Sequence, residues 1–267
     1  MKLTNTLAST TQPSVATIGK KYSAAIQSTS DRCQTCCTKT ACEAQSLVDN
    51  LSGNENKLFF RTHRINKGQH LFYAGEQLDT LYLVKSGLFK SYFNSEVGDE
   101  QVMGFHMPGE VLGADAIAHH PQSISAVAIE PSMVCALPIK KLESSSHHAF
   151  SAWLLKQVYQ EVLRERKMLL VSGRKYNAEA RVACFLLELS ARNHARGYSE
   201  QEFKLSMPHR DIAHYLDMAL ETVSRVFTRL QDNGLLIFER PYVKITDVGK
   251  LRSLAGIHES EKQLLRA

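Results

Sequence analysis

The sequence predicts an α+β protein in which an antiparallel β-domain is followed by a long helix and a C-terminal winged helix-turn-helix. Three observations support this prediction. Short apolar runs broken by glycine fill residues 61–137, and residues 149–171 contain neither glycine nor proline. Residues 207–233 hold two short helical patterns separated by a tight turn.

The β-domain is predicted from its turn signals. Runs rich in β-forming residues, such as LYLV at 81–84, lie between turns such as KSG at 85–87. This spacing is typical of an antiparallel sandwich, jelly roll or barrel. The pattern predicts a fold and no particular chemistry.

Residues 149–171 are predicted to form one helix that ends at Ser172-Gly173. A stripe with coiled-coil spacing runs along it: Leu155, Val158, Val162, Glu165 and Leu169. The stripe fits either packing on the chain's own β-domain or a homodimer seam. In a symmetric pair the two Glu165 carboxylates would face each other, so we interpret the seam as a marginal one that a switch could use.

The helix-turn-helix comprises predicted helices at 210–216 and 220–232, followed by a hairpin, or wing, at 235–238 and 242–245. Glu221, Ser224 and Arg225 share one face of the second helix. Arg225 can bond to guanine, Glu221 to a cytosine amino group and Ser224 to either kind of base. Local ion pairing on an exposed helix is the alternative, which the order helix, turn, helix and wing disfavours. Double-stranded DNA is the expected partner.

The composition is that of an ordinary globular protein, with 43% hydrophobic and 22% charged residues and a net charge of +5. The first thirty residues are polar and lack the apolar core of a secretory signal. No apolar run reaches the length of a membrane span. We therefore expect a cytoplasmic protein with no membrane partner, a compartment in which structural disulfides are rare.

Four of the six cysteines lie within the ten residues CQTCCTKTAC at 33–42. In the cytoplasm, clustered thiols more often bind a metal or react than form structural disulfides. Cys184 differs, because it lies inside a predicted helix at 178–196 that Asn177 can cap. We expect Cys184 to be a buried structural thiol.

These features together resemble the cyclic-AMP receptor protein/FNR superfamily of transcription regulators, from about residue 47 to the C-terminus. The E-x-x-S-R sequence at 221–225 carries much of the resemblance. The cysteine cluster and the segments GDEQVMGFH at 98–106 and SMVC at 132–135 resemble the FNR branch, which regulates anaerobic metabolism in response to oxygen. The resemblance implies a jelly roll like that of cyclic-nucleotide-binding domains, a dimerisation helix and a winged helix-turn-helix.

The resemblance also implies a 4Fe-4S cluster. Cys33, Cys36 and Cys42 have the C-x2-C-x5-C spacing of the family, and Cys135 stands at the fourth ligand position. Thiolates suit iron–sulfur clusters, although four of them also suit structural zinc, and haem or thiol redox sensing are further alternatives. Cys37 is an additional cysteine that the family spacing does not require, and we hypothesise that it alters oxygen sensitivity or captures sulfur.

The function implied is activation and repression of anaerobic and respiratory genes. Oxygen or nitric oxide would be the signal, and a cluster-loaded homodimer would bind TTGAT-type palindromes and contact RNA polymerase. Cyclic-nucleotide binders keep an Arg-Ser pair, but here Ile124 precedes Ser125, so no cyclic nucleotide is expected. Asp217 replaces the usual glycine at the helix-helix turn, where aspartate tolerates a left-handed backbone. An iron–sulfur redox enzyme is a remote alternative, since no dinucleotide, P-loop or nucleophile motif occurs.

The predicted organisation follows from these assignments. A flexible arm spans 1–30, the cysteine-rich segment 31–46, the β-roll 47–148, the dimerisation helix 149–172 and the DNA-binding domain 173–267.

Overall fold

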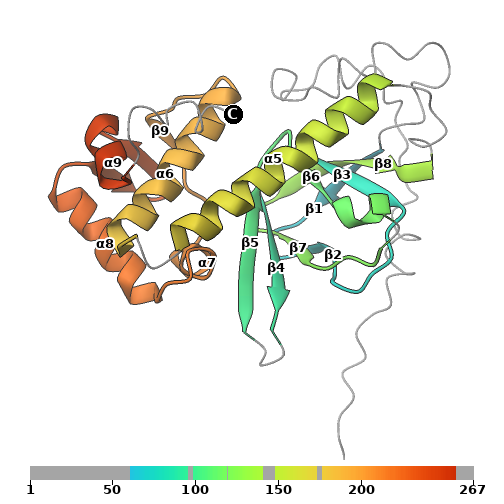
Figure 1. Ribbon diagram of the computed structural model, residues 1–267, viewed down its shortest axis with the longest axis horizontal. Helices are drawn as coiled ribbons and strands as arrows, with labels where there is room; N and C mark the ends of the chain where they lie inside the picture. The colour runs from blue at the N-terminus through green and yellow to red at the C-terminus, as the bar shows by residue number, and fades with distance from the viewer. Residues whose placement is uncertain (1–60, 96–98, 119, 141–147, 173–175, 257–267) are drawn as a thin grey trace, which may run out of the picture.

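The computed structural model describes residues 61–95, 99–118, 120–140, 148–172 and 176–256. The predicted arm and the cysteine-rich segment, with Cys33, Cys36, Cys37 and Cys42, lie outside the described residues. Figure 1 shows a β-domain and a helical C-terminal domain joined by one long helix.

The β-domain consists of two antiparallel four-stranded sheets, so the predicted antiparallel β-fold is confirmed. The strand orders are β1-β8-β3-β6 and β2-β7-β4-β5. The strands are β1 (Arg61–Ile65), β2 (His70–Phe72), β3 (Thr80–Ser86), β4 (Phe89–Asn94), β5 (Glu100–His106), β6 (Val111–Leu112), β7 (Ser125–Ala128) and β8 (Ser132–Pro138). Residues such as Phe72, Phe89 and Val134 form the core between the sheets.

A second apolar cluster covers the other face of the first sheet. Leu81 and Leu83 of β3 and Leu137 of β8 contribute to it, together with Trp153 of the long helix. Alternate residues of a strand point to opposite faces, and this is why β3 and β8 supply both clusters. The cluster fixes the start of the long helix on the β-domain.

The long helix, α5 (His148–Ser172), agrees with the predicted range. Trp153, near its beginning, is 6% exposed in the β-domain cluster. Met168 and Val171, near its end, are each 6% exposed in a cluster that they share with the C-terminal domain. The two ends of α5 are thus anchored in different cores. No helix among the described residues is long and apolar enough to cross a membrane.

The C-terminal domain confirms the predicted winged helix-turn-helix and adds two elements that were not predicted, β9 and α9. Its elements are α6 (Ala178–Ala195), β9 (Glu202–Lys204), α7 (His209–Tyr215), α8 (Leu220–Asp232), β10 (Leu236–Glu239), β11 (Tyr242–Ile245) and α9 (Val248–Leu254). The wing sheet has the order β10-β11-β9.

Three local predictions in this domain are confirmed. Asn177 caps α6, since its Oδ1 accepts a hydrogen bond from the Ala180 N–H at 2.8 Å. Asp217, in the turn between α7 and α8, has a φ of 52° and is the one non-glycine residue with positive φ in the described ranges. Cys184 is buried in the core, and burial raises the pKa of its thiol to about 11.

Candidate functional site

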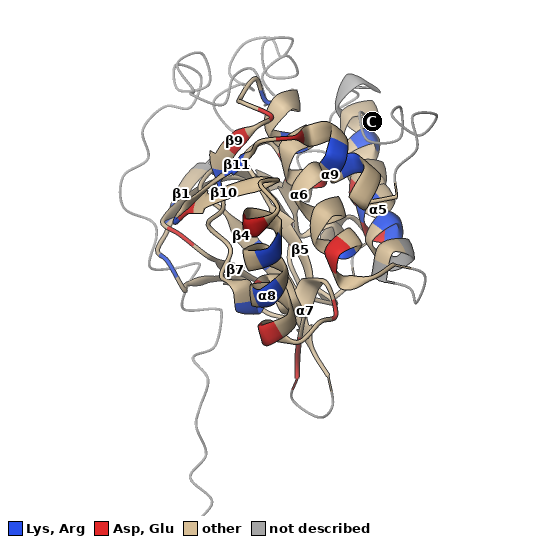
Figure 2. Ribbon diagram, turned by 90° about the vertical axis from the view of Figure 1, so that its left-hand side faces the viewer, with Lys and Arg blue, Asp and Glu red and all other residues tan. Residues whose placement is uncertain are grey.

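The predicted base-reading residues lie on the solvent-facing side of α8. Glu221 and Arg225 are exposed and Ser224 is partly exposed. The opposite side is apolar and buried, with Val223, Val226, Phe227 and Leu230. Figure 2 shows α8 at the surface, in front of the other elements of the domain. The helix therefore presents the geometry required to enter a major groove.

Local ion pairing does not occupy this face. Within the described part of the chain, neither Glu221 nor Arg225 forms an ion pair, whereas Arg229, one turn further on, binds Glu179 of α6 at 3.0 Å. The first turn of α8 also lacks a side-chain cap, because Ala219 stands at the N-cap. Uncapped backbone N–H groups at a helix N-terminus favour an anion such as a DNA phosphate.

His209, which the sequence analysis did not single out, supports the recognition helix. Its ring stacks on Phe227 of α8 with centroids 4.6 Å apart, and on Phe238 of the wing at 5.6 Å. Its Nδ1 lies 3.4 Å from the Ser224 Oγ. His209 thus joins α7, α8 and the wing behind one of the base-reading residues. Its position at the start of α7 is the only sequence signal that could have indicated it.

Cys135 lies on β8, in register with Thr62 of β1 and Leu83 of β3. Its half-buried side chain packs against the apolar cluster that contains Trp153 and, at its edge, Leu154 of α5. The described residues contain no group of three or more histidine, cysteine or acidic side chains able to hold a metal. The three other predicted cluster ligands lie outside these ranges. A half-exposed thiol on an outer sheet face is chemically suited to act as one thiolate ligand of a cluster completed from elsewhere.

The predicted seam of α5 is partly exposed. Leu155 is 70% exposed, and Tyr159, which was not predicted, is 57% exposed. The other predicted positions differ in exposure: Val158 and Val162 are half-buried, Glu165 is exposed, and the side chain of Leu169 lies outside the description. Leu155, Tyr159, Val162 and Arg166 form an alternative stripe with spacings of 4, 3 and 4 residues, which also suits a helix pair.

Two family profiles match the chain. One is described as a cyclic nucleotide-binding domain and covers residues 62–145. The other is described as a Crp-like helix-turn-helix domain and covers residues 180–254. Their order and limits agree with the two domains of the structure.

Several characterised relatives are similar over most of the chain. The anaerobic regulatory protein of Aggregatibacter actinomycetemcomitans is 35% identical over 235 residues, which are 87% of this chain and 91% of that protein. The fumarate and nitrate reduction regulatory protein of Escherichia coli (strain K12) is 38% identical over 228 residues, 84% of this chain and 90% of that protein.

Solved structures agree on the fold. FixK2 from Bradyrhizobium japonicum has a TM-score of 0.66 and 27% identity, covering 74% of this chain and 98% of its own. A CRP-family transcriptional regulator from Thermus thermophilus has a TM-score of 0.60 and 20% identity, covering 73% of this chain and 96% of its own. These matches are to regulators and not to enzymes, and the chain belongs to the CRP/FNR family of DNA-binding transcription regulators, with relatives in its FNR branch.

Proposed function

We propose that this regulator activates and represses genes of anaerobic and respiratory metabolism in response to oxygen. A labile 4Fe-4S cluster would control its dimerisation and its binding to TTGAT-type palindromes. One observation carries the proposal. Cys135, the proposed fourth ligand, packs against the apolar cluster to which Trp153 of α5 belongs, so its sheet face also holds the helix that would form the dimer. The names of the relatives, which refer to anaerobic regulation and to fumarate and nitrate reduction, support the class of target gene.

The ligands of the cluster would be Cys33, Cys36, Cys42 and Cys135. When bound, a 4Fe-4S cluster supplies a group that reacts with oxygen or nitric oxide. A shared ligand set would tie the N-terminal cysteines to the sheet face at Cys135, whose apolar cluster includes Trp153. The order of that N-terminal segment against α5 would then depend on the signal.

The exposed face of α5 would form the homodimer. Leu155 and Val162 belong both to the stripe predicted from the sequence and to the stripe that includes Tyr159, so either stripe places them in the dimer contact. Glu165 lies beside them and is exposed. Like charges facing each other across a symmetric seam weaken it. We therefore retain Glu165 as a residue that keeps the dimer marginal and responsive.

Each copy would read one half-site with α8. Arg225 would fork onto guanine, Glu221 would accept from a cytosine amino group and Ser224 would contact either kind of base. The two-fold symmetry of the dimer would match the inverted repeat of the DNA. Loops of the β-domain, including residues 94–100, would contact RNA polymerase, and the protein would act in the cytoplasm.

A cyclic nucleotide is not part of the proposal. Ile124 stands where an arginine would grip a cyclic phosphate. Ser125, the next residue, is buried, and its Oγ accepts a hydrogen bond from the Ala74 N–H at 3.0 Å. Burying a phosphate here without a guanidinium would be poorly compensated.

The test is purification without oxygen, followed by iron, sulfide and zinc analysis and by duplex binding before and after exposure to air. We expect iron and sulfide in equal amounts, tight binding to a TTGAT palindrome and loss of that binding in air. A zinc protein whose DNA binding is indifferent to air would refute the oxygen-sensing proposal.

A further inference from the structure

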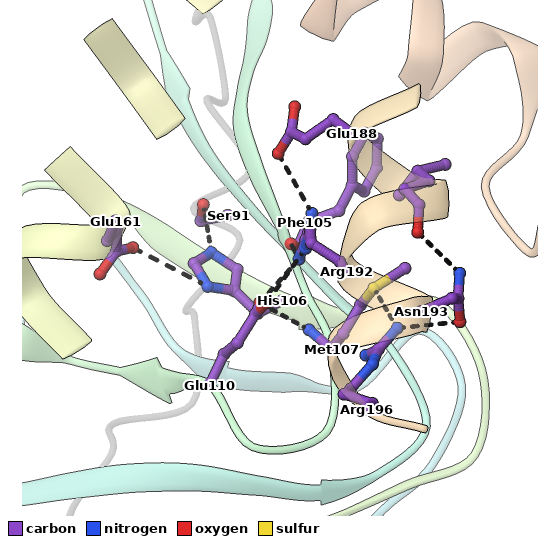
Figure 3. Close-up of polar contacts among 11 residues, drawn as sticks. Ser91, Phe105, His106, Met107, Glu110, Glu161, Glu188, Arg192, Asn193 and Arg196 are labelled. Atoms are coloured by element: carbon purple, nitrogen blue, oxygen red, sulfur yellow. Dashed lines mark hydrogen bonds and ion pairs between the residues drawn. The ribbon is translucent and has the colours of Figure 1, made fainter. Parts of the chain in front are cut away.

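Arg192 of α6 reaches out of the DNA-binding domain into the β-domain. Its Nε donates to Glu110 Oε1 at 3.0 Å and its Nη2 donates to Glu110 Oε2 at 2.7 Å. The same Nη2 also donates to the backbone carbonyl of Phe105. The side chains of Arg192 and Glu110 are only 14% and 13% exposed. Figure 3 shows this two-pronged contact between the domains.

The carboxylate that receives Arg192 is held firmly. Glu110 Oε2 accepts a hydrogen bond from the Met107 N–H at 2.9 Å. The backbone on both sides of it is bonded to Val84 of β3, through the Gly109 N–H and the Glu110 carbonyl, each at 2.9 Å. Burial alone would raise the pKa of Glu110, but Arg192 and Arg164 lower it to about 2. Glu110 is therefore a fixed anion on the β-domain.

The dimerisation helix meets the two domains at the same place. His106 of β5 lies with its Nδ1 3.8 Å from Glu161 Oε1 of α5, and its Nε2 lies 2.8 Å from the Ser91 Oγ. Glu188, one turn before Arg192 on α6, lies 3.6 Å from the guanidinium. Elements of the β-domain, α5 and α6 thus converge around one buried polar cluster (Figure 3).

The rest of the domain contact combines single-point polar contacts with apolar packing. Lys90 of β4 pairs with Asp211 of α7 at 3.0 Å, and the Gln101 side-chain amide donates to the His214 carbonyl at 2.7 Å. Phe105 of β5 packs against Phe185 of α6 and Tyr215 of α7, with ring centroids 6.1 Å and 5.2 Å apart. Apolar contacts and single-point polar contacts tolerate small rotations, whereas a planar guanidinium with two prongs on one carboxylate favours a single orientation. A buried ion pair is a weak contributor to net stability, so orientation is the property that it supplies best.

We propose that Arg192 is a positioning residue that fixes the orientation of the DNA-binding domain relative to α5, and thereby sets the half-site spacing that the dimer accepts. This inference rests on the proposed function. Arg192 itself touches no base in this scheme. It acts through α6, which belongs to the same domain as α7 and α8. Loss of Arg192 would therefore let the two α8 helices of the dimer vary in position relative to each other while each stays intact.

The test compares binding of the anaerobic, full-length protein to a set of duplexes. The set contains one half-site, the best palindrome, and palindromes whose half-sites are one or two base pairs closer or further apart. Arg192→Lys keeps the charge and removes the fork. We expect it to weaken binding to the best palindrome by about 2- to 30-fold, the range of typical coupling energies. Affinity for the half-site should stay within twofold, and the preference among spacings should flatten.

Two further variants make the result decisive. Glu110→Gln removes the same interaction from the other side and should reproduce the effect, and the double variant should show no additional loss. Lys250→Gln is the matched control, because Lys250 is 77% exposed and its ion pair, with Asp247, lies within its own domain. This control should bind all duplexes as the unmodified protein does.

The outcomes distinguish failure of the positioning role from failure of the proposed function. Equal losses on the half-site and on every palindrome, or no change on any duplex for either the Arg192 or the Glu110 variant, would overturn the positioning role. If the unmodified protein bound no palindrome better than random DNA, the proposed function would be refuted, and this inference with it. A variant that is selective for spacing, with a thermal unfolding curve like that of the control, would support it.

Discussion

Truncation of Leu155 to alanine should disrupt the dimer without disturbing the monomer. Leu155→Ala removes three carbons, worth about 0.8 kcal/mol each when fully buried. Because Leu155 is 70% exposed in the single chain, a partner can recover at most about 1.7 kcal/mol from these carbons, using the same coefficient. Both copies are truncated in a symmetric dimer, so we expect a penalty of about 3 kcal/mol, or roughly 100-fold in the dimer dissociation constant.

Sedimentation equilibrium over a concentration series, performed without oxygen, measures this constant. Ile237→Ala is a suitable control, because Ile237 is an apolar residue of the wing that is 47% exposed. Its truncation should leave the dimer unchanged. Thermal unfolding of the Leu155→Ala monomer should shift little, since an exposed side chain contributes little to the fold of its own chain. A dimer constant within twofold of the unmodified protein would refute the seam assignment.

Three more substitutions test the charge of Glu161, base reading by Arg225 and the ring stack of His209. Burial raises the pKa of Glu161 to about 7 from 4.5, so its charge lowers the stability of the fold as the pH rises through this range. Glu161→Gln should therefore stabilise the fold by about 3 kcal/mol at pH 8 and not at all near pH 4.5. Denaturant unfolding at both pH values measures this, and an equal effect at both would contradict it. Arg225→Ala removes a bidentate contact with guanine, so it should weaken binding to the TTGAT palindrome by about 1–3 kcal/mol and binding to random duplex much less. Fluorescence anisotropy measures both affinities, and equal losses on the two duplexes would show that Arg225 does not read bases. His209→Ala should destabilise the fold by about 1 kcal/mol, because it removes the ring stack on Phe227. It should also relax the base preference at the position that Ser224 reads, which a selection from randomised half-sites would measure. An unchanged selected sequence would limit His209 to a structural role.

The elements of the DNA-binding domain could be predicted because their signals are local. An N-cap asparagine at 177, the buried face of α8 and the short wing turn between residues 238 and 242 each act within a few residues. Asp217 illustrates the same point, because a turn between two helices requires a left-handed residue and few side chains other than glycine tolerate one. Strand β9 and helix α9 were missed because each is short and derives its stability mainly from packing on the wing or on α6.

The phase of the α5 stripe could not be predicted in full. Apolar spacing along the sequence fits two overlapping stripes, and only tertiary contact decides between them. Trp153 and Met168 dock on the two cores, and their burial turns Leu155 and Tyr159 outward. The contact between Arg192 and Glu110 left no sequence signal at all, since its partners are 82 residues apart and neither belongs to a periodic pattern.

The arrangement of α5 explains how the β-domain and the DNA-binding domain can be coupled through one helix. At about 1.5 Å per residue a helix of this length extends nearly 40 Å. One end is fixed through Trp153 to the sheet face that carries Cys135, and the other through Met168 to the apolar cluster that the DNA-binding domain shares with the β-domain. A rigid helix can carry a displacement from one domain to the other if the placement of the domains around it is also fixed. Apolar packing alone would let the DNA-binding domain rotate, and the two-pronged contact of Arg192 with Glu110 opposes this rotation together with single-point contacts such as Lys90 with Asp211.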